Sequence, residues 1–97
     1  APAELWRIVK SVAREGAWVH ISDLRRPETI EEATELVRTY ASEEPSILQR
    51  DFYNSLCAAF TPREVEKQLR EGGLGGLQVE ALGDRHIQVF GRLDTSA

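Results

Sequence analysis

Residues 16–27 constrain the fold more than any other part of the chain. Residues 17–22 have the apolar and β-branched composition of a short buried strand, and a glycine precedes them. Asp23, Arg25 and Arg26 follow at once, and the proline that ends the segment prevents the strand from continuing. In open α/β sheets, ligands bind in the crevice outside the carboxyl ends of the strands. The segment therefore predicts a strand that ends in a charged ligand-binding crevice.

Apolar spacing and start signals predict four helices around this strand. The first covers residues 3–15, and its core face is expected to consist of Leu5, Ile8, Val9 and Val12. The others are expected over residues 29–40, 46–59 and 61–71. The second and the fourth begin with a threonine followed three residues later by a glutamate, which is the capping-box pattern. Ser46 is the expected cap of the third helix.

The C-terminal part predicts an antiparallel hairpin, because two alternating runs, 77–82 and 86–90, flank a short glycine-containing turn. The whole chain, 1–97, is therefore expected to be a single α/β domain or a fragment of one. Its expected parts are a helix plus strand (1–27), a helical insertion (28–60), a helix plus hairpin (61–93) and a tail (94–97).

Charge and composition exclude several classes of partner. The formal net charge is −4, which argues against nucleic acid, since nucleic-acid-binding surfaces are basic. No apolar run approaches the roughly 20 residues that cross a bilayer, so no membrane partner is expected. Cys57 is the single cysteine, which leaves no internal disulfide and no multi-cysteine metal site. We therefore expect a cytoplasmic chain in which Cys57 lies in the core.

Several runs, taken in order, resemble the C-terminal half of a class I S-adenosylmethionine-dependent methyltransferase. Arg14–Asp23 is similar to the junction between a helix and the fifth strand of that family, Thr61–Val65 to the start of a later helix, and 77–91 to the final hairpin. Asp23–Pro27 and Asp51–Phe60 look similar to runs in one small-molecule methyltransferase subgroup. The resemblance covers about Leu5 to Leu93. It implies a partial Rossmann-like fold in which the helical insertion covers the site of a small-molecule methyl acceptor.

The cofactor-binding part of that family has no counterpart in this chain. The family binds S-adenosylmethionine with its N-terminal half, through a glycine-rich turn that follows the first strand. The glycine-rich run here, 72–76, ends a helix and leads into a strand, whereas a nucleotide cradle leads from a strand into a helix. We interpret the run as a helix C-cap and loop. The resemblance therefore implies S-adenosylmethionine as the cofactor of the complete family, but no cofactor-binding residue and no activity in this chain alone.

The charged residues after the strand each have two interpretations. Asp23 is a candidate catalytic residue that holds or deprotonates the acceptor, which requires hydrogen-bond reach. Aspartate is also common in turns because it hydrogen-bonds its own backbone. Arg25 and Arg26 are candidate substrate-binding residues, since guanidinium groups bind carboxylates, but solvated turn arginines give the same pattern.

Aromatic residues of the insertion supply the other candidates. Tyr40, Tyr53 and Phe60 line an acceptor pocket in one interpretation and belong to a helical core face in the other. His20 and His86 are interpreted as structural, because neither has a metal-ligand partner at helical spacing.

Two hypotheses of function follow. In the first, the chain is the C-terminal portion of a small-molecule methyltransferase and contributes acceptor-site and sheet residues to a site completed elsewhere. In the second, it is a non-enzymatic α/β interaction module. Residues 18–21 would then form an exposed strand edge, and such edges recruit further strands, so a homo-oligomer is expected.

Overall fold

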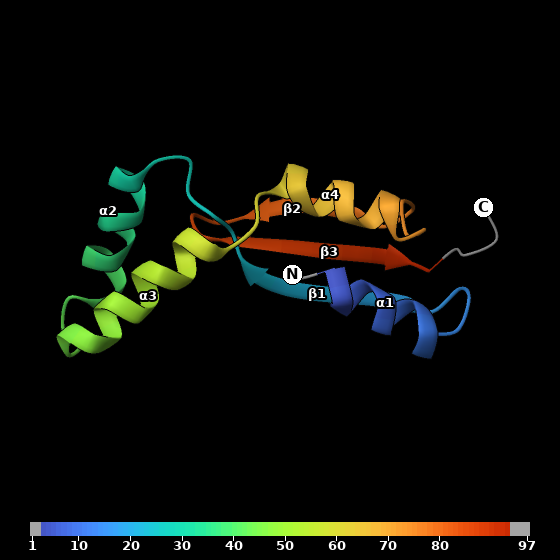
Figure 1. Ribbon diagram of the computed structural model, residues 1–97, viewed down its shortest axis with the longest axis horizontal. Coiled ribbons are helices and arrows are strands. Elements are labelled where there is room, and N and C mark those ends of the chain that lie inside the picture. Colours follow the sequence, from blue (N-terminus) through green and yellow to red (C-terminus); the bar gives the residue numbers. More distant parts are fainter. Residues whose placement is uncertain (1–2, 94–97) are drawn as a thin grey trace.

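The computed structural model describes residues 3–93, which form a mixed α/β fold of four helices and a three-stranded sheet (Figure 1). The elements in chain order are α1 (Ala3–Val12), β1 (Trp18–Leu24), α2 (Ile30–Ala41), α3 (Ser46–Ala58), α4 (Pro62–Glu71), β2 (Gln78–Leu82) and β3 (His86–Arg92). The predicted order of elements is confirmed. The tail expected at residues 94–97 lies outside the described residues.

The sheet is antiparallel, with the strand order β1-β3-β2. In the register of the central strand, Val89 lies between Ile21 of β1 and Val79 of β2. Gly83 adopts a φ of 62° in the turn between β2 and β3, a conformation that glycine adopts without steric cost. The predicted hairpin is therefore confirmed, and β1 forms one edge of the sheet.

The main hydrophobic core lies between the sheet and the two helices that cover one of its faces, α1 and α4. Its buried residues are Trp6, Val19, Val65, Leu69, Leu74, Leu77, Ile87, Val89 and Leu93. The indole Nε1–H of Trp6 donates a hydrogen bond to Gln68 Oε1 at 3.0 Å, which joins α1 to α4 and satisfies the polar atom of the buried ring.

The core face predicted for the first helix is wrong in part. Trp6 is 1% exposed, whereas Ile8 and Val12 are 57% and 75% exposed. Leu5 and Val9 are partly buried against the core as expected. The helix is rotated so that its largest apolar side chain enters the core, which buries the most apolar surface. Ile8 and Val12 consequently face away from α4.

The prediction of a buried first strand is also wrong. Val19 is buried in β1, but Trp18 is 64% exposed. The physical reason is that the core, with α1 and α4, lies on one face of the sheet. Side chains alternate between the two faces of a strand, so the residues on either side of Val19 lie on the face opposite to the core.

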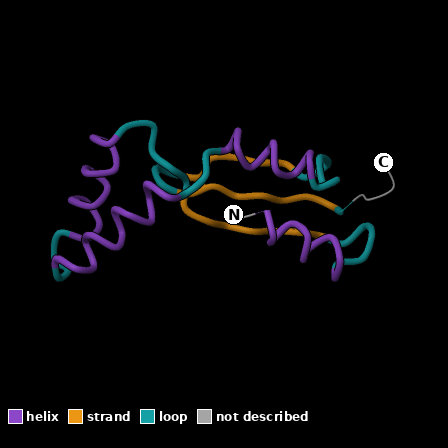
Figure 2. The backbone as a smooth tube through the Cα atoms, viewed as in Figure 1, coloured by secondary structure: helices purple, strands orange, loops and turns teal. Residues whose placement is uncertain are grey.

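The predicted insertion forms an antiparallel helical hairpin, α2 and α3, which projects from one end of the sheet (Figures 1 and 2). The molecule is therefore elongated, with extents of 47 × 22 × 19 Å. The Thr29 hydroxyl accepts the backbone N–H of Glu32 at 3.1 Å, as predicted, but the Glu32 carboxylate accepts the N–H of Glu28 at 3.3 Å and not that of Thr29, so only half of the predicted capping box forms. Ser46 does not cap α3; Pro45 occupies that position, and no side chain caps the helix. Within the described range, no helix combines the length and the apolar character needed to cross a membrane.

Candidate functional site

The carboxyl end of β1 opens into a cavity of about 470 Å³ at the junction between the sheet and the helical hairpin. Four parts of the chain meet there: the connection after β1, the start of α2, the start of α4 and the β2–β3 hairpin. We call this cavity the junction groove. Its lining residues are Arg25, Arg26, Pro27, Glu28, Glu32, Thr61, Pro62, Ala81 and Asp84. The predicted crevice at this end of the strand is therefore present in the structure.

Arg25 fixes the β2–β3 hairpin against the end of β1. Its Nη1 donates to the carbonyl oxygen of His86 at 2.7 Å and its Nη2 to that of Gly83 at 3.2 Å. Its backbone N–H donates to the carbonyl oxygen of Arg85 at 2.8 Å. A guanidinium group carries five N–H donors, so these bonds hold Arg25 in place without using all of them.

Arg26 forms an ion pair with Glu64 at the start of α4. Arg26 Nη2 lies 3.0 Å from Glu64 Oε1, which also accepts the backbone N–H of Thr61 at 2.8 Å. The Thr61 hydroxyl accepts the N–H of Glu64 in return, so the predicted capping box is confirmed. The backbone hydrogen bond from Thr61, more than the charge of Arg26, lowers the pKa of Glu64. The carboxylate therefore stays ionised and holds both the helix start and the arginine.

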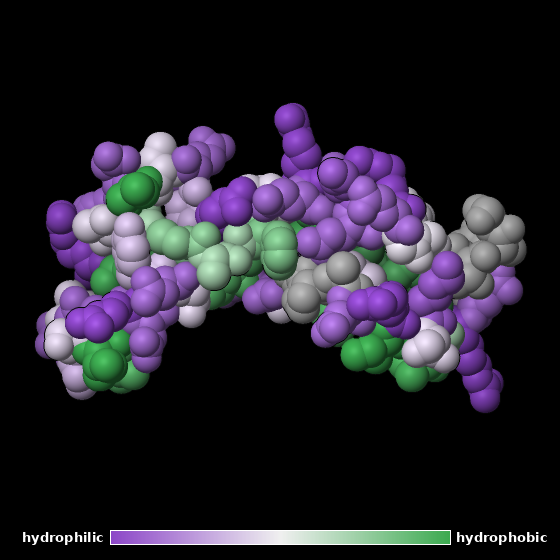
Figure 3. All heavy atoms as spheres, in the orientation of Figure 1, coloured by the Kyte–Doolittle hydropathy of each residue, from purple (hydrophilic) through white to green (hydrophobic). Residues whose placement is uncertain are grey.

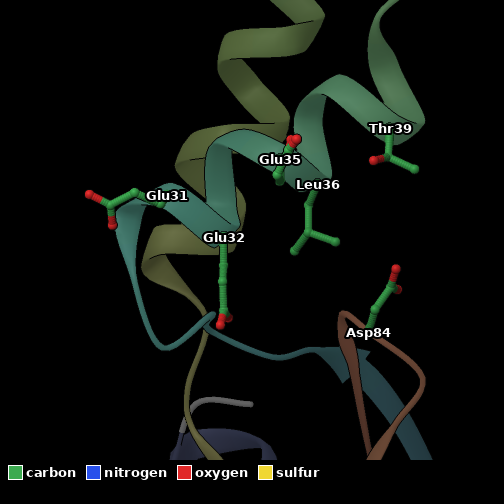
Figure 4. A pocket seen from close by; sticks show the side chains of 6 residues that line it. All are labelled: Glu31, Glu32, Glu35, Leu36, Thr39 and Asp84. Carbon is green, nitrogen blue, oxygen red and sulfur yellow. The ribbon is translucent and has the colours of Figure 1, made fainter.

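A second cavity, of about 540 Å³, continues from the junction groove between α2 and the β2–β3 turn (Figure 4). The two cavities share Glu32 and Asp84. We call the second one the acidic cavity, since four of its six lining residues carry carboxylates; the lining is Glu31, Glu32, Glu35, Leu36, Thr39 and Asp84. In Figure 4 the residues of α2 form one wall, and Asp84 faces them from the turn.

A contact between α2 and the sheet borders the acidic cavity. The Tyr40 hydroxyl donates to Asp84 Oδ2 at 2.6 Å. Arg85 Cζ lies 3.7 Å from the centroid of the Tyr40 ring, and Arg85 Nη1 lies 2.9 Å from Asp84 Oδ1. The hydrogen bond from Tyr40 lowers the pKa of Asp84, and the same bond raises the pKa of Tyr40. We call this set of three residues the latch.

The structure does not bring all the predicted site residues together. Arg25 and Arg26 line the junction groove, and Tyr40 borders the acidic cavity through the latch. Asp23 precedes the groove on β1, where its Oδ1 accepts the N–H of Leu24 at 2.8 Å. Aspartate thus bonds the backbone here, as one of its two interpretations predicts.

Two predicted aromatic residues lie away from both cavities. Tyr53 faces a separate hollow of about 310 Å³ between α2 and α3. Its hydrogen bond with the Cys57 thiol raises the pKa of Tyr53. Phe60 is partly buried and packs against the main core. Cys57 itself is exposed, so the prediction of a core cysteine is wrong; Leu56 occupies the buried position on that turn of α3.

Sequence reasoning missed Glu32, Asp84 and Arg85 as site residues. The sequence indicates that Glu32 belongs to a helix start and that Asp84 belongs to a turn. Neither signal shows that the two lie in one cavity, because they are far apart in the chain and their elements do not pair. No other local pattern in the sequence indicates that Glu32 and Asp84 line the same cavity.

The site suits the binding of a small polar molecule. Carboxylates of Glu32 and Asp84 can accept hydrogen bonds or attract a positive charge, and Thr61 and Pro62 add a mixed polar and apolar wall. Among residues 3–93, no group of three or more histidine, cysteine, aspartate or glutamate side chains is arranged to hold a metal ion. Comparisons with models of known protein families, with curated proteins and with solved structures each found no match.

Proposed function

We propose that this chain is the C-terminal portion of a cytoplasmic S-adenosylmethionine-dependent small-molecule methyltransferase, in which the junction groove holds the methyl acceptor. The observation that carries the proposal is the groove itself, at the carboxyl end of β1 and lined by Arg25 and Arg26. The order of helix, strand, helical insertion, helix and hairpin also agrees with the order that the sequence resemblance implies.

In this proposal, the chain positions the methyl acceptor and does not bind the cofactor. Methyl transfer requires that the acceptor atom and the methyl donor are held in line, and such orientation supplies much of a rate enhancement. Arg25 and Arg26 would orient a polar acceptor, and Asp23 stays a predicted acceptor-site residue just before them. The S-adenosylmethionine would be bound by residues outside this chain, so the chain alone would be inactive.

An NMR titration of the ¹⁵N-labelled chain tests this proposal. Small carboxylates, phenols and amines at millimolar concentration are expected to shift the amide signals of Arg26, Glu32 and Asp84, because these residues line the groove. S-adenosylmethionine is expected to shift no signal. Gln49, which lies in the separate hollow on the helical hairpin, provides the control signal.

Two outcomes would count against the proposal. Tight, saturable binding of S-adenosylmethionine by the isolated chain would mean that it holds a cofactor site of its own. Failure of every small molecule to shift the groove signals would mean that the groove is not an acceptor site.

A second candidate function is self-association through the free edge of β1. The bonds Arg25 N–H to Arg85 O and Leu93 N–H to Ala17 O show that the odd-numbered residues of β1 bond toward β3. In an antiparallel pair the alternate residues point their N–H and C=O groups away from the partner. Trp18, His20 and Ser22 therefore present backbone donors and acceptors to the free edge.

Exposed apolar side chains lie above the same edge. Ile8 and Val12 are on the side of α1 opposite to Trp6 and Lys10, the residues that contact α4. Both side chains are exposed, and Figure 3 shows hydrophobic atoms exposed where α1 lies in Figure 1. In this proposal, a strand added to β1 would pack near these side chains. In a two-fold dimer both copies would use this surface, and we propose a homo-oligomer of this kind as the alternative.

A further inference from the structure

The α2–α3 hairpin has buried side chains of its own. Leu56 and Leu36 are 0% and 9% exposed, and Ala33 and Ala41 are buried beside them. None of these residues belongs to the cluster that the sheet encloses with α1 and α4. Because the two sets of apolar contacts are separate, the hairpin can move relative to the sheet without opening the main core.

Two neighbouring backbone segments, which we call the attachment, connect this hairpin to the sheet. The chain leaves the sheet at Arg25 and returns at Phe60, and these two residues form a parallel bridge. The backbone N–H of Arg26 donates to the carbonyl oxygen of Phe60 at 3.2 Å. The outgoing and the returning segments therefore run side by side, as Figure 2 shows at the end of the sheet. Connecting segments of this kind absorb the backbone rotation in hinge motions.

The latch joins the far end of α2 to the β2–β3 turn, which the attachment also contacts through the bond from the Arg25 N–H to the Arg85 carbonyl oxygen. Tyr40 is in the last turn of α2, at the end of the helix opposite to its N-cap, Thr29. Its partners, Asp84 and Arg85, belong to the β2–β3 turn rather than to the connecting segments. Tyr40 is 47% exposed, so water competes for these contacts and their net contribution is small. A contact of this strength forms and breaks reversibly.

We propose that the α2–α3 hairpin is a lid that pivots at the Arg25–Phe60 attachment and is held against the sheet by the latch. The acidic cavity has one wall on α2 and its other wall at Asp84, so release of the latch separates the walls and admits a ligand. Closure of the latch then encloses the ligand between the lid and the sheet. The chemical class of that ligand rests on the proposed function. The pivoting of the α2–α3 hairpin does not depend on the proposed function.

Double electron–electron resonance between two nitroxide labels tests the lid without any ligand. The labels are attached at Glu43→Cys, at the tip of the hairpin, and at Gln78→Cys, at the start of β2; both positions are exposed. The native thiol is removed by Cys57→Ser, which is tolerable because Cys57 is exposed. With the latch intact, one dominant distance is expected beside a minor displaced population, since the contact opens reversibly. Tyr40→Phe removes the hydroxyl that bonds Asp84, and the displaced population is expected to grow.

Tyr53→Phe is the matched control, because it removes a hydroxyl that lies within the hairpin. It should leave the distance distribution unchanged. Arg85→Ala provides a second test of the latch through the ring contact of Tyr40, and circular dichroism confirms that each variant is folded. If both latch variants give the distribution of the unmodified chain, the latch does not hold the hairpin and the proposal is overturned. That result would leave the ligand titration, and with it the proposed function, unaffected.

Discussion

Replacing Leu69 by alanine is expected to destabilise the whole chain by about 2–5 kcal/mol, the usual cost of deleting a buried leucine side chain. Leu69 is 1% exposed and lies in the main core between α4 and the sheet. Folded domains have a total stability of about 5–15 kcal/mol, and small domains bury less surface than large ones. Urea unfolding followed by circular dichroism should therefore show a lower midpoint and a substantial unfolded population for Leu69→Ala.

Leu56→Ala is the matched variant in the helical hairpin. Leu56 is 0% exposed, but it belongs to the separate set of apolar contacts on α2 and α3. We expect faster amide hydrogen exchange in α2 and α3, with the protection of β3 retained, because the hairpin opens without the core. If Leu56→Ala removes the protection of β3 as strongly as Leu69→Ala does, the chain unfolds as one cooperative unit and the two-part description is wrong.

His20→Pro is expected to weaken self-association by about ten- to a hundredfold. Proline has no N–H, and the N–H of His20 points to the free edge of β1. Each lost hydrogen bond costs about 0.5–1.5 kcal/mol, and a two-fold dimer loses it twice. Proline is tolerated on edge strands, so the fold itself should persist. Sedimentation velocity at micromolar concentration gives the populations of monomer and oligomer.

His20→Ala separates this effect from the loss of the side chain. The His20 ring contacts Gln88 Oε1 at 3.2 Å, and both substitutions remove that contact, whereas alanine keeps the backbone N–H. His20→Ala should therefore associate like the unmodified chain. A monodisperse monomer for the unmodified chain, or equal weakening by both substitutions, would contradict pairing at this edge.

The sequence was sufficient to predict the elements because their ends have strong local signals. Thr61, Pro62 and Glu64 together specify a helix start, and the structure shows the complete capping box. Gly73 adopts a φ of 78° directly after α4, a conformation typical of a glycine at a helix end, which agrees with the interpretation of the run as a helix C-cap and loop. Such signals depend on neighbouring residues alone.

Burial was harder to predict, because it depends on what faces each element. Spacing places Leu5 and Val9 in the middle of an apolar face of the first helix, with Ile8 on one side of them and Trp6 on the other. The choice between them depends on where the sheet ends. Trp18 is exposed because its side chain lies on the face of the sheet opposite to α1 and α4.

The sequence predicts the part of the candidate site that directly follows β1. Arg25 and Arg26 line the groove because they come directly after β1, where the starts of α2 and α4 and the β2–β3 hairpin meet. Tyr40 was expected to line a pocket, but its hydrogen bond to Asp84 joins residues 44 positions apart. A contact at that separation depends on the direction in which the helical hairpin leaves the sheet, which no local pattern encodes.

We propose that these residues form the acceptor side of a methyltransferase whose cofactor is bound by residues outside the given sequence. Sequencing the native gene upstream of the codon for Ala1 tests it most directly. We predict an open reading frame that encodes a strand followed by a glycine-rich turn of the Glu/Asp-x-Gly-x-Gly type. A reading frame that begins at Ala1, or one whose upstream sequence lacks such a strand and turn, would contradict the account.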